Sequence, residues 1–172
     1  MAILARDEIL RRIHAGIIRI DPFDEELVGP ASVDLHLGDQ FRVFKRVRDI
    51  FQVTEAADYE SVTDLLTIDE GDYFVLMPGE TAHGLTRERI MLPDNVCGWL
   101  QGRSRLARIG LMVHITASFM HPGIDNHQTL EMNNAGPMPL AIRPGIKICQ
   151  FVFEEMVGSG HYSGRFQHQL HP

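Results

Sequence analysis

Three Pro-Gly turns separate short apolar runs along this chain, and this rhythm restricts the fold more than any other feature. The turns stand at Pro78-Gly79, Pro122-Gly123 and Pro144-Gly145. Proline presets the first corner of such a turn, and glycine accepts the positive φ of the second. Apolar or alternating runs predict strands at 33–37, 41–47, 73–76, 96–100, 111–115, 129–132, 140–142 and 148–153. The pattern predicts an all-β fold, a compact barrel or sandwich.

Other segments break the strand pattern. Residues 6–16 carry Ile9, Leu10 and Ile13 at helical spacing, which predicts one short amphipathic helix. Residues 50–66 are acidic and poorly periodic, which is typical of a surface insertion. The phrases around Pro78-Gly79 and Pro144-Gly145 look alike and predict two similar hairpins. We expect residues 1–172 to form one domain, with 159–172 as a flexible tail or a lid.

Composition narrows the class of protein. With 172 residues, 44% of them hydrophobic, the chain can bury one core. No apolar run reaches the length of a membrane span and no cleavable signal opens the chain, so we expect a cytoplasmic protein with no membrane partner. Cys97 and Cys149 stand in apolar runs typical of buried thiols. The net charge of −7 argues against a nucleic acid polymer as partner.

An arginine-rich stretch stands out against this acidic background. Gly102 is followed by Arg103, Ser104, Arg105, Leu106, Ala107 and Arg108, between two strand-like runs. Guanidinium groups suit bidentate contacts with phosphate, and a glycine lets the backbone approach an anion, so this stretch predicts a phosphate cradle. A solvated basic turn explains the same residues equally well. The glycine and lysine pattern of a Walker loop is missing.

A single carboxylate, Glu131, lies in the strand-like run 128–134. Strict alternation puts Thr129 and Glu131 on one face and Leu130 and Met132 on the other. A carboxylate on a strand usually marks the wet face. If that face lines a closed pocket, desolvation suits the carboxyl group to proton transfer near neutral pH.

The chain has nine histidines, yet its patterns do not predict a metal site. The His-x-Glu and Pro-Cys-x-x-Cys signature of zinc nucleobase deaminases is absent, as is His-Glu-x-x-His. His114, in an apolar run, is more typical of a hydrogen-bonded core residue than of a ligand. We therefore expect no metal held by protein ligands.

The end of the chain gathers aromatic, cationic and amide side chains between Tyr162 and Gln169. Such a segment can close over a nucleotide and exclude water. A disordered tail is the alternative.

Together these motifs resemble the dCTP deaminases of the trimeric dUTPase superfamily. The resemblance covers nearly the whole chain, through residues 7–22 and 29–38, and it is most specific at 98–111 and 113–117. It implies a distorted β-barrel (β-clip) fold with one or two short helices, a homotrimer with sites shared between subunits, and dCTP as the small-molecule substrate. It also implies that Mg²⁺ arrives with the triphosphate.

The resemblance assigns roles residue by residue. It places Glu131 on the general acid/base and Arg103, Ser104 and Arg108 on the segment that holds the triphosphate and orders the reaction centre. Ile115 and Ala117 match the segment that reads the cytosine edge, and Tyr162, Arg165 and Gln169 match a tail that closes over the sugar and phosphates. The full set of expected substrate-binding residues is Arg103, Ser104, Arg105, Leu106, Ala107, Arg108, Ile115, Ala117, His121, Thr129, Leu130, Tyr162, Arg165 and Gln169, with Glu131, Ser104 and Arg108 as catalytic residues.

The chain also departs from the pattern of its relatives. Arg105 stands where serine or threonine is common, Arg165 where lysine is common, and His121 where many relatives have aspartate; Asp125 and Asn126 replace small residues. The leading hypothesis is deamination of dCTP to dUTP and ammonia. Because His121 lacks the carboxylate that serves hydrolysis of dUTP, it argues against the first alternative, a bifunctional enzyme releasing dUMP and pyrophosphate. The second alternative is a nucleotide-sensing trimer without chemistry.

Overall fold

The computed structural model describes residues 2–46, 49–113 and 116–172, and most of these residues lie in or between strands. Two α-helices interrupt them, α1 (Arg6–His14) and the single turn α2 (Ser104–Ala107). Two 3₁₀ turns lie at Glu25–Leu27 and Tyr59–Val62. No helix in these ranges has the length and apolar character needed to cross a membrane. The predicted all-β class is confirmed, and the predicted helix at 6–16 ends two residues early.

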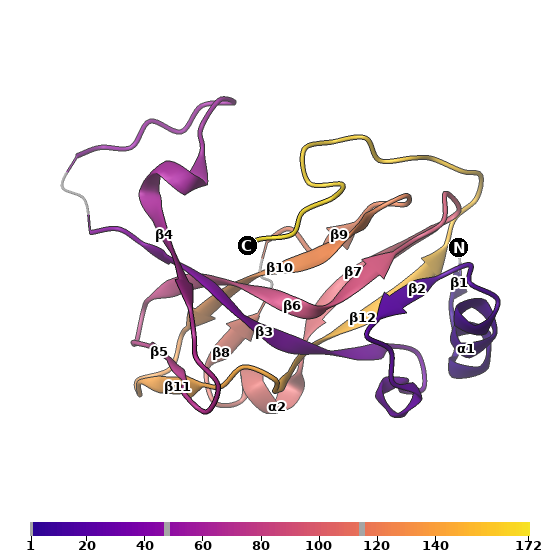
Figure 1. Cartoon of the computed structure of the whole chain (residues 1–172), viewed down its shortest axis with the longest axis horizontal. Coiled ribbons are helices and arrows are strands. Elements are labelled where there is room, and N and C mark those ends of the chain that lie inside the picture. Colours follow the sequence, from indigo (N-terminus) through magenta and orange to yellow (C-terminus); the bar gives the residue numbers. More distant parts are fainter. Residues whose placement is uncertain (1, 47–48, 114–115) are drawn as a thin grey trace.

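Ten strands of the described residues form one antiparallel, strongly curled sheet (Figure 1). Its main path runs β8-β10-β6-β3-β12-β7-β9, while β1 pairs with β12, β2 with β6 and β4 with β3. The strands are β1 (Ala2–Ile3), β2 (Arg19–Asp21), β3 (Val33–Phe44), β4 (Thr63–Thr67), β6 (Thr81–Met91), β7 (Val96–Gly102), β8 (Leu111–Val113), β9 (Phe119–Met120), β10 (Asp125–Asn134) and β12 (Lys147–Glu155).

A second, small sheet consists of β5 (Phe74–Leu76) and β11 (Leu140–Ile142). These strands belong to the two similar phrases that the sequence predicts as separate hairpins. That prediction is wrong, because the two phrases pair with each other, Leu76 opposite Leu140 and Phe74 opposite Ile142. Both strands then turn at glycines with positive φ, Gly79 and Gly145. Each of the two similar phrases therefore supplies one strand of this small sheet.

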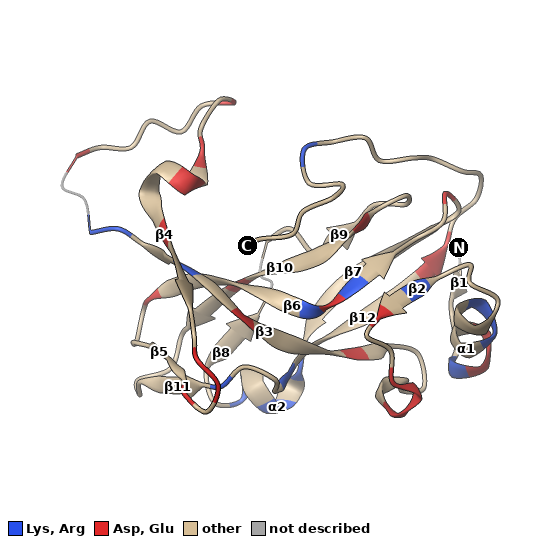
Figure 2. Ribbon diagram, in the orientation of Figure 1, with Lys and Arg blue, Asp and Glu red and all other residues tan. Residues whose placement is uncertain are grey.

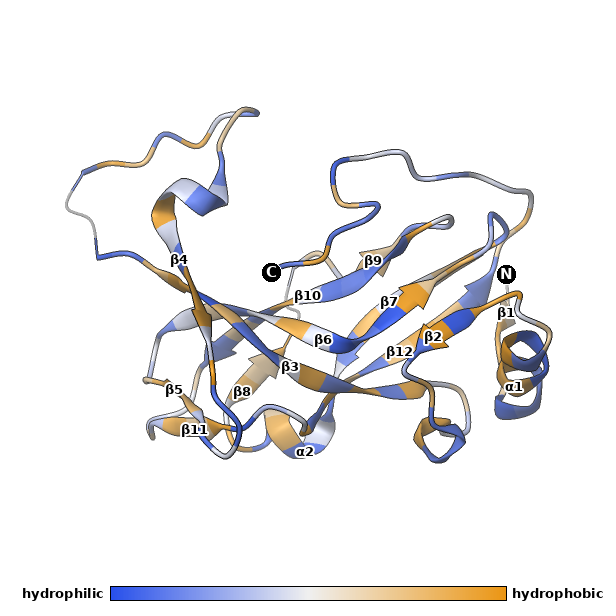
Figure 3. Cartoon of the chain, in the orientation of Figure 1, coloured by the Kyte–Doolittle hydropathy of each residue, from blue (hydrophilic) through white to orange (hydrophobic). Residues whose placement is uncertain are grey.

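The core fills the concave side of the curled sheet. Alternating hydrophobic and polar residues along the long strands are visible in Figure 3, and they place Phe41, Phe151 and Phe153 inside with no exposed surface. Full burial of such a side chain stabilises the fold by about 1.5–3 kcal/mol. Cys97 and Cys149 are buried thiols, as predicted.

Five strands of the described residues escaped the sequence prediction: β1, β2, β4, β6 and β9. The central strand β6 was missed because its inward positions hold Gly84, Thr86 and Glu88, which carry little apolar signal although all three are buried. The segment 50–66 is not wholly a surface insertion, since β4 adds a strand beside β3. The predicted strands 33–37 and 41–47 form the single strand β3, which ends at Phe44.

Candidate active site

A cavity of about 410 Å³ lies between β9, β10, β6 and the C-terminal tail, and we call it the glutamate pocket. Its lining includes six of the residues predicted from sequence: Ala117, His121, Thr129, Glu131, Tyr162 and Gln169. They come from three separate stretches of the chain. The fold therefore brings together residues that the sequence grouped only by resemblance.

Glu131 is presented by β10, a strand whose exposure alternates strictly from residue to residue. The predicted face is therefore correct: Glu131 and Thr129 are half-buried toward the pocket, while Leu130 and Met132 have no exposed surface. Thr116 Oγ1 donates a hydrogen bond to Glu131 Oε2 at 3.0 Å. The carboxylate is thus half-buried and held at one oxygen by Thr116.

The hydroxyl of Thr129 is buried beside Glu131. Within the described residues it has no hydrogen-bond partner. A buried hydroxyl without a partner is costly, and it suits a site where a ligand supplies the missing group. The hydroxyl is therefore a buried polar group next to Glu131 that no described residue satisfies.

Nine of the lining residues were not predicted, and His83 and Tyr59 are the two whose rings lie beside Glu131's strand. His83 lies on the unpredicted strand β6, directly opposite Glu131 in the ladder. Burial lowers the pKa of His83, opposed by Glu131 and aided by Arg42. Tyr59 comes from the segment read as a surface insertion, and its ring meets the His83 ring edge-on with centroids 5.9 Å apart. Only a prediction of β6 could have placed His83 here.

An aromatic wall closes one side of the glutamate pocket. The rings of His121 and Tyr162 stack nearly parallel with centroids 5.0 Å apart. Phe119 meets His121 edge-on at 4.9 Å. The imidazole of His121 therefore packs flat against the ring of Tyr162 in the tail. In the family pattern given above, this position is commonly an aspartate, whose carboxylate would carry a negative charge.

The tail lies along β10 and covers the pocket. The backbone amides of Asp125 and His127 donate to the carbonyls of Gln167 and Gln169, at 3.1 and 3.2 Å. Asn126 Nδ2 donates to the carbonyl of Phe166 at 2.6 Å. The tail thus lies against the open side of β10, and its action as a lid stays a prediction.

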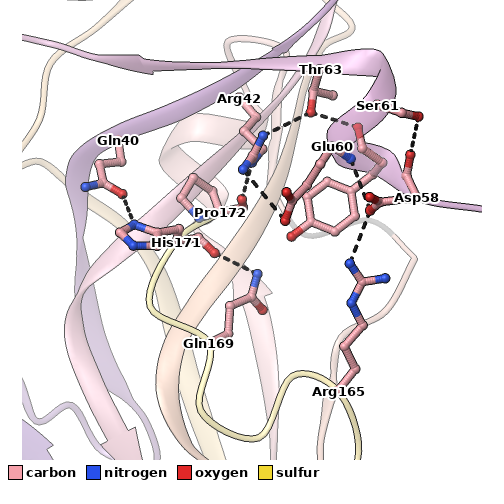
Figure 4. A network of polar contacts seen from close by, with 11 residues as sticks. Gln40, Arg42, Asp58, Glu60, Ser61, Thr63, Arg165, Gln169, His171 and Pro172 are labelled. Atoms are coloured by element: carbon pink, nitrogen blue, oxygen red, sulfur yellow. Dashed lines mark hydrogen bonds and ion pairs between the residues drawn. The ribbon is translucent and has the colours of Figure 1, made fainter.

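A polar network fastens the tail to the segment around Tyr59 and to β3 (Figure 4). Arg165 forms an ion pair with Asp58 at 3.1 Å, and its guanidinium lies 5.8 Å from the Tyr59 ring centroid. Arg42 donates to the carbonyl of Pro172. His171 Nδ1 lies 2.9 Å from Gln40 Oε1. The Arg165 side chain is thus occupied by a carboxylate at the edge of the pocket.

The stretch 102–108, which we call the arginine segment, lies elsewhere. Figure 2 shows basic residues gathered on and beside α2, away from the tail. A second cavity of about 610 Å³ is lined by Arg103, Ser104, Arg105, Ala107 and Asp34, among others. Arg103 pairs with Asp34 at 3.1 Å and donates to the carbonyl of Lys147. Ser104, Arg105 and Arg108 are exposed, and Leu106 packs against the core.

The structure does not bring all the predicted residues together. The lining residues described for the glutamate pocket and for the second cavity do not overlap. The side chain of Leu130 is in the core, on the far side of β10. Arg165 points to Asp58. Ile115, and His114 with its predicted core role, fall outside the described residues.

Comparison with known proteins decides the family. The model of the family described as dCTP deaminase-like matches residues 3–156. The chain belongs to this family. The match ends before the tail that covers the glutamate pocket.

Two curated relatives cover almost the whole chain. A "dCTP deaminase, dUMP-forming" of Parafrankia sp. is 40% identical over 177 residues, with 99% of this chain and 88% of the relative covered. A "dCTP deaminase" of Rhodospirillum rubrum is 44% identical over 161 residues, with 90% and 83% covered.

A solved structure supports the fold. The 2'-deoxycytidine 5'-triphosphate deaminase of Agrobacterium tumefaciens aligns with a TM-score of 0.68 at 20% identity. The alignment covers 88% of this chain and 47% of that chain, so the present protein spans about half its length. The expected fold of the dCTP deaminase kind is confirmed.

Proposed function

We propose that this protein deaminates dCTP, with Glu131 as general acid and base. The observation that carries the proposal is the half-buried Glu131 carboxylate beside the Thr129 hydroxyl, which has no partner among the described residues, in a pocket that the tail covers. The names of the Parafrankia and Rhodospirillum relatives support the substrate.

The reaction consumes one water and needs no electron transfer. Glu131 takes a proton from the water as its oxygen forms a bond to C4 of cytosine, and the proton passes to N3. Glu131 then moves the second proton from the new hydroxyl to the amino nitrogen. The C4–N bond breaks and ammonia leaves, with a carbonyl at C4. Closure by the tail excludes bulk water from these transfers.

We further propose that the working unit is a homotrimer in which one subunit's arginine segment completes a neighbour's glutamate pocket. Ser104 and Arg108 are exposed and are not among the lining residues of the pocket in their own chain, which supports this arrangement. Ser104 and Arg108 would stabilise the attacking water and the charge that develops on the base. Arg103 and Arg105 would contact the triphosphate, which enters as its Mg²⁺ complex.

The test is a chromatographic assay with dCTP, dCMP, CTP and dUTP, each with Mg²⁺. We expect ammonia and a deoxyuridine nucleotide from dCTP, and no turnover of CTP or dCMP. A protein that binds dCTP without turning it over would be a nucleotide sensor, which would refute the proposal.

The end product distinguishes two candidate activities, deamination alone and deamination followed by hydrolysis of dUTP. His121 offers a ring and no carboxylate, which favours release of dUTP. The name of the Parafrankia relative favours a second hydrolysis to dUMP and pyrophosphate. We propose dUTP as the product and expect His121→Asp to add pyrophosphate release. If the unaltered protein already releases pyrophosphate, the second candidate is correct.

A further inference from the structure

His83 stands in the middle of a row of three charged or titratable side chains across the sheet. In the ladder between β3 and β6 it is paired with Arg42, and in the ladder between β6 and β10 it is paired with Glu131. Directly opposed residues on neighbouring antiparallel strands share a face, with Cβ atoms about 4.5–5.5 Å apart. The imidazole therefore lies between a guanidinium and the carboxylate of the glutamate pocket.

The surroundings of His83 favour the neutral imidazole. The ring lines the glutamate pocket, and the rings of Phe44 and Tyr59 meet it edge-on, at centroid distances of 5.3 and 5.9 Å. Burial lowers the pKa of His83, Glu131 raises it and Arg42 lowers it. Among the described residues, the charged and titratable groups that face the ring are Arg42 from β3, Glu131 from β10 and Tyr59 from the 3₁₀ turn. A neutral imidazole keeps one N–H donor and one acceptor nitrogen.

We propose that His83 is a positioning residue for Glu131, presenting an N–H to the carboxylate and holding it ionised as the base that activates water. Arg42 favours this orientation, because the cation turns the acceptor nitrogen toward itself and the N–H toward the anion. Thr116 engages Glu131 Oε2, so the two groups hold the carboxylate from two sides. The inference rests on the proposed deamination and adds a residue that acts through Glu131.

The first test compares two replacements of His83 in turnover of dCTP. His83→Leu keeps apolar volume and removes the donor, whereas His83→Gln keeps an N–H. A hydrogen bond to a charged group is worth about ten- to a hundredfold in rate. We expect His83→Leu to lower kcat by about that factor with KM within about threefold, and His83→Gln to restore most of the activity. His14→Gln, at an exposed histidine on α1, is the control.

The pH profile separates positioning from packing. Without the donor, the ionised carboxylate loses stabilisation, so the acid limb of kcat should move to higher pH in His83→Leu and stay near its place in His83→Gln. Equal losses in both variants with an unmoved acid limb would show a packing role and overturn the proposal, as would full activity of His83→Leu.

A second measurement needs no turnover. Nitrogen NMR of the imidazoles, in the unaltered protein and in Glu131→Gln, reports the protonation midpoint of His83. Since Glu131 raises the pKa of His83, the midpoint should fall in Glu131→Gln. An unchanged midpoint would overturn the coupling even if the enzyme is active. A protein that never turns over dCTP but shows the coupling would refute the proposed function and leave the pairing intact.

Discussion

The glutamate pocket and the arginine segment differ in how much of their environment one chain supplies. Around Glu131, the strands β6, β9 and β10, the 3₁₀ turn and the tail line the pocket, and the buried hydroxyl of Thr129 has no partner among the described residues. Around α2, by contrast, Ser104, Arg105 and Arg108 face solvent. The half of the site that we propose for proton transfer is built within the subunit, and the half that we propose for phosphate binding is presented outward. An arginine remains charged wherever it stands, so the arginine segment needs no closed surroundings to keep its charge.

We expect the largest effect on turnover from a replacement in the glutamate pocket. Glu131→Gln removes the proton acceptor and keeps the shape of the pocket, so turnover of dCTP should fall by at least about a thousandfold. Binding of dCTP, measured by calorimetry, should change by less than about threefold. Asp64→Asn is the control, since this exposed carboxylate on β4 pairs with Lys45 outside the pocket. Residual turnover near the unaltered rate would refute the assignment of Glu131.

We expect the second-largest effect on turnover from a replacement in the arginine segment. Arg108→Ala should lower kcat by about a hundredfold, because a lost donor at developing charge is not replaced by water in a closed site. The fold should be unaffected, since Arg108 is exposed. Steady-state kinetics with Arg87→Ala, an exposed arginine on β6, provides the comparison. Equal small losses in both variants would mean that the arginine segment is only a basic surface.

The tail should give a smaller effect, mainly on KM. Arg165→Ala removes a charge that we expect to reach the triphosphate, and KM for dCTP should rise about tenfold. Asp58→Asn removes its present partner, and because that ion pair is exposed the change in KM should stay within about threefold. If the two replacements raise KM equally, Arg165 acts by fastening the tail and does not meet the nucleotide.

The smallest effect separates binding from stability. Thr129→Val removes a buried hydroxyl without a partner, so the free energy of unfolding should rise or stay equal, by about 0–1 kcal/mol in urea titrations. KM for dCTP should nevertheless rise a few-fold, since the ligand loses a partner. A less stable variant with unchanged KM would show that the hydroxyl is structural.

Sequence reasoning succeeded where a residue's neighbours along the chain decide its surroundings. The alternation around Glu131 correctly gave the face of β10, and the Pro-Gly turns gave the all-β class. It failed where pairing between strands that are far apart in the sequence decides the surroundings of a residue. β6 carries a weak apolar signal, so His83 and its position opposite Glu131 could not be foreseen. The partnership of β5 with β11 was equally hidden, because likeness between two phrases does not say that they pair.

The tail and the departures from the family pattern show the same limit. Sequence placed Tyr162 and Gln169 at the nucleotide by resemblance, and the structure brings both to the pocket. It could not show that His121 would stack on Tyr162, or that Asn126 would hold the carbonyl of Phe166. Both contacts depend on where a chain end folds back, which no local pattern specifies.

The most direct measurement is complementation between subunits. Glu131→Gln and Arg108→Ala chains, each nearly inactive alone, would be co-expressed with different tags and purified as mixed assemblies. If the arginine segment of one subunit completes the glutamate pocket of another, one of the three sites in each mixed trimer combines an intact Glu131 with an intact Arg108, which is about a third of the sites. Our account predicts that dCTP deamination returns to about that fraction of the unaltered rate. Mixed assemblies as inactive as the separate variants would contradict a shared site.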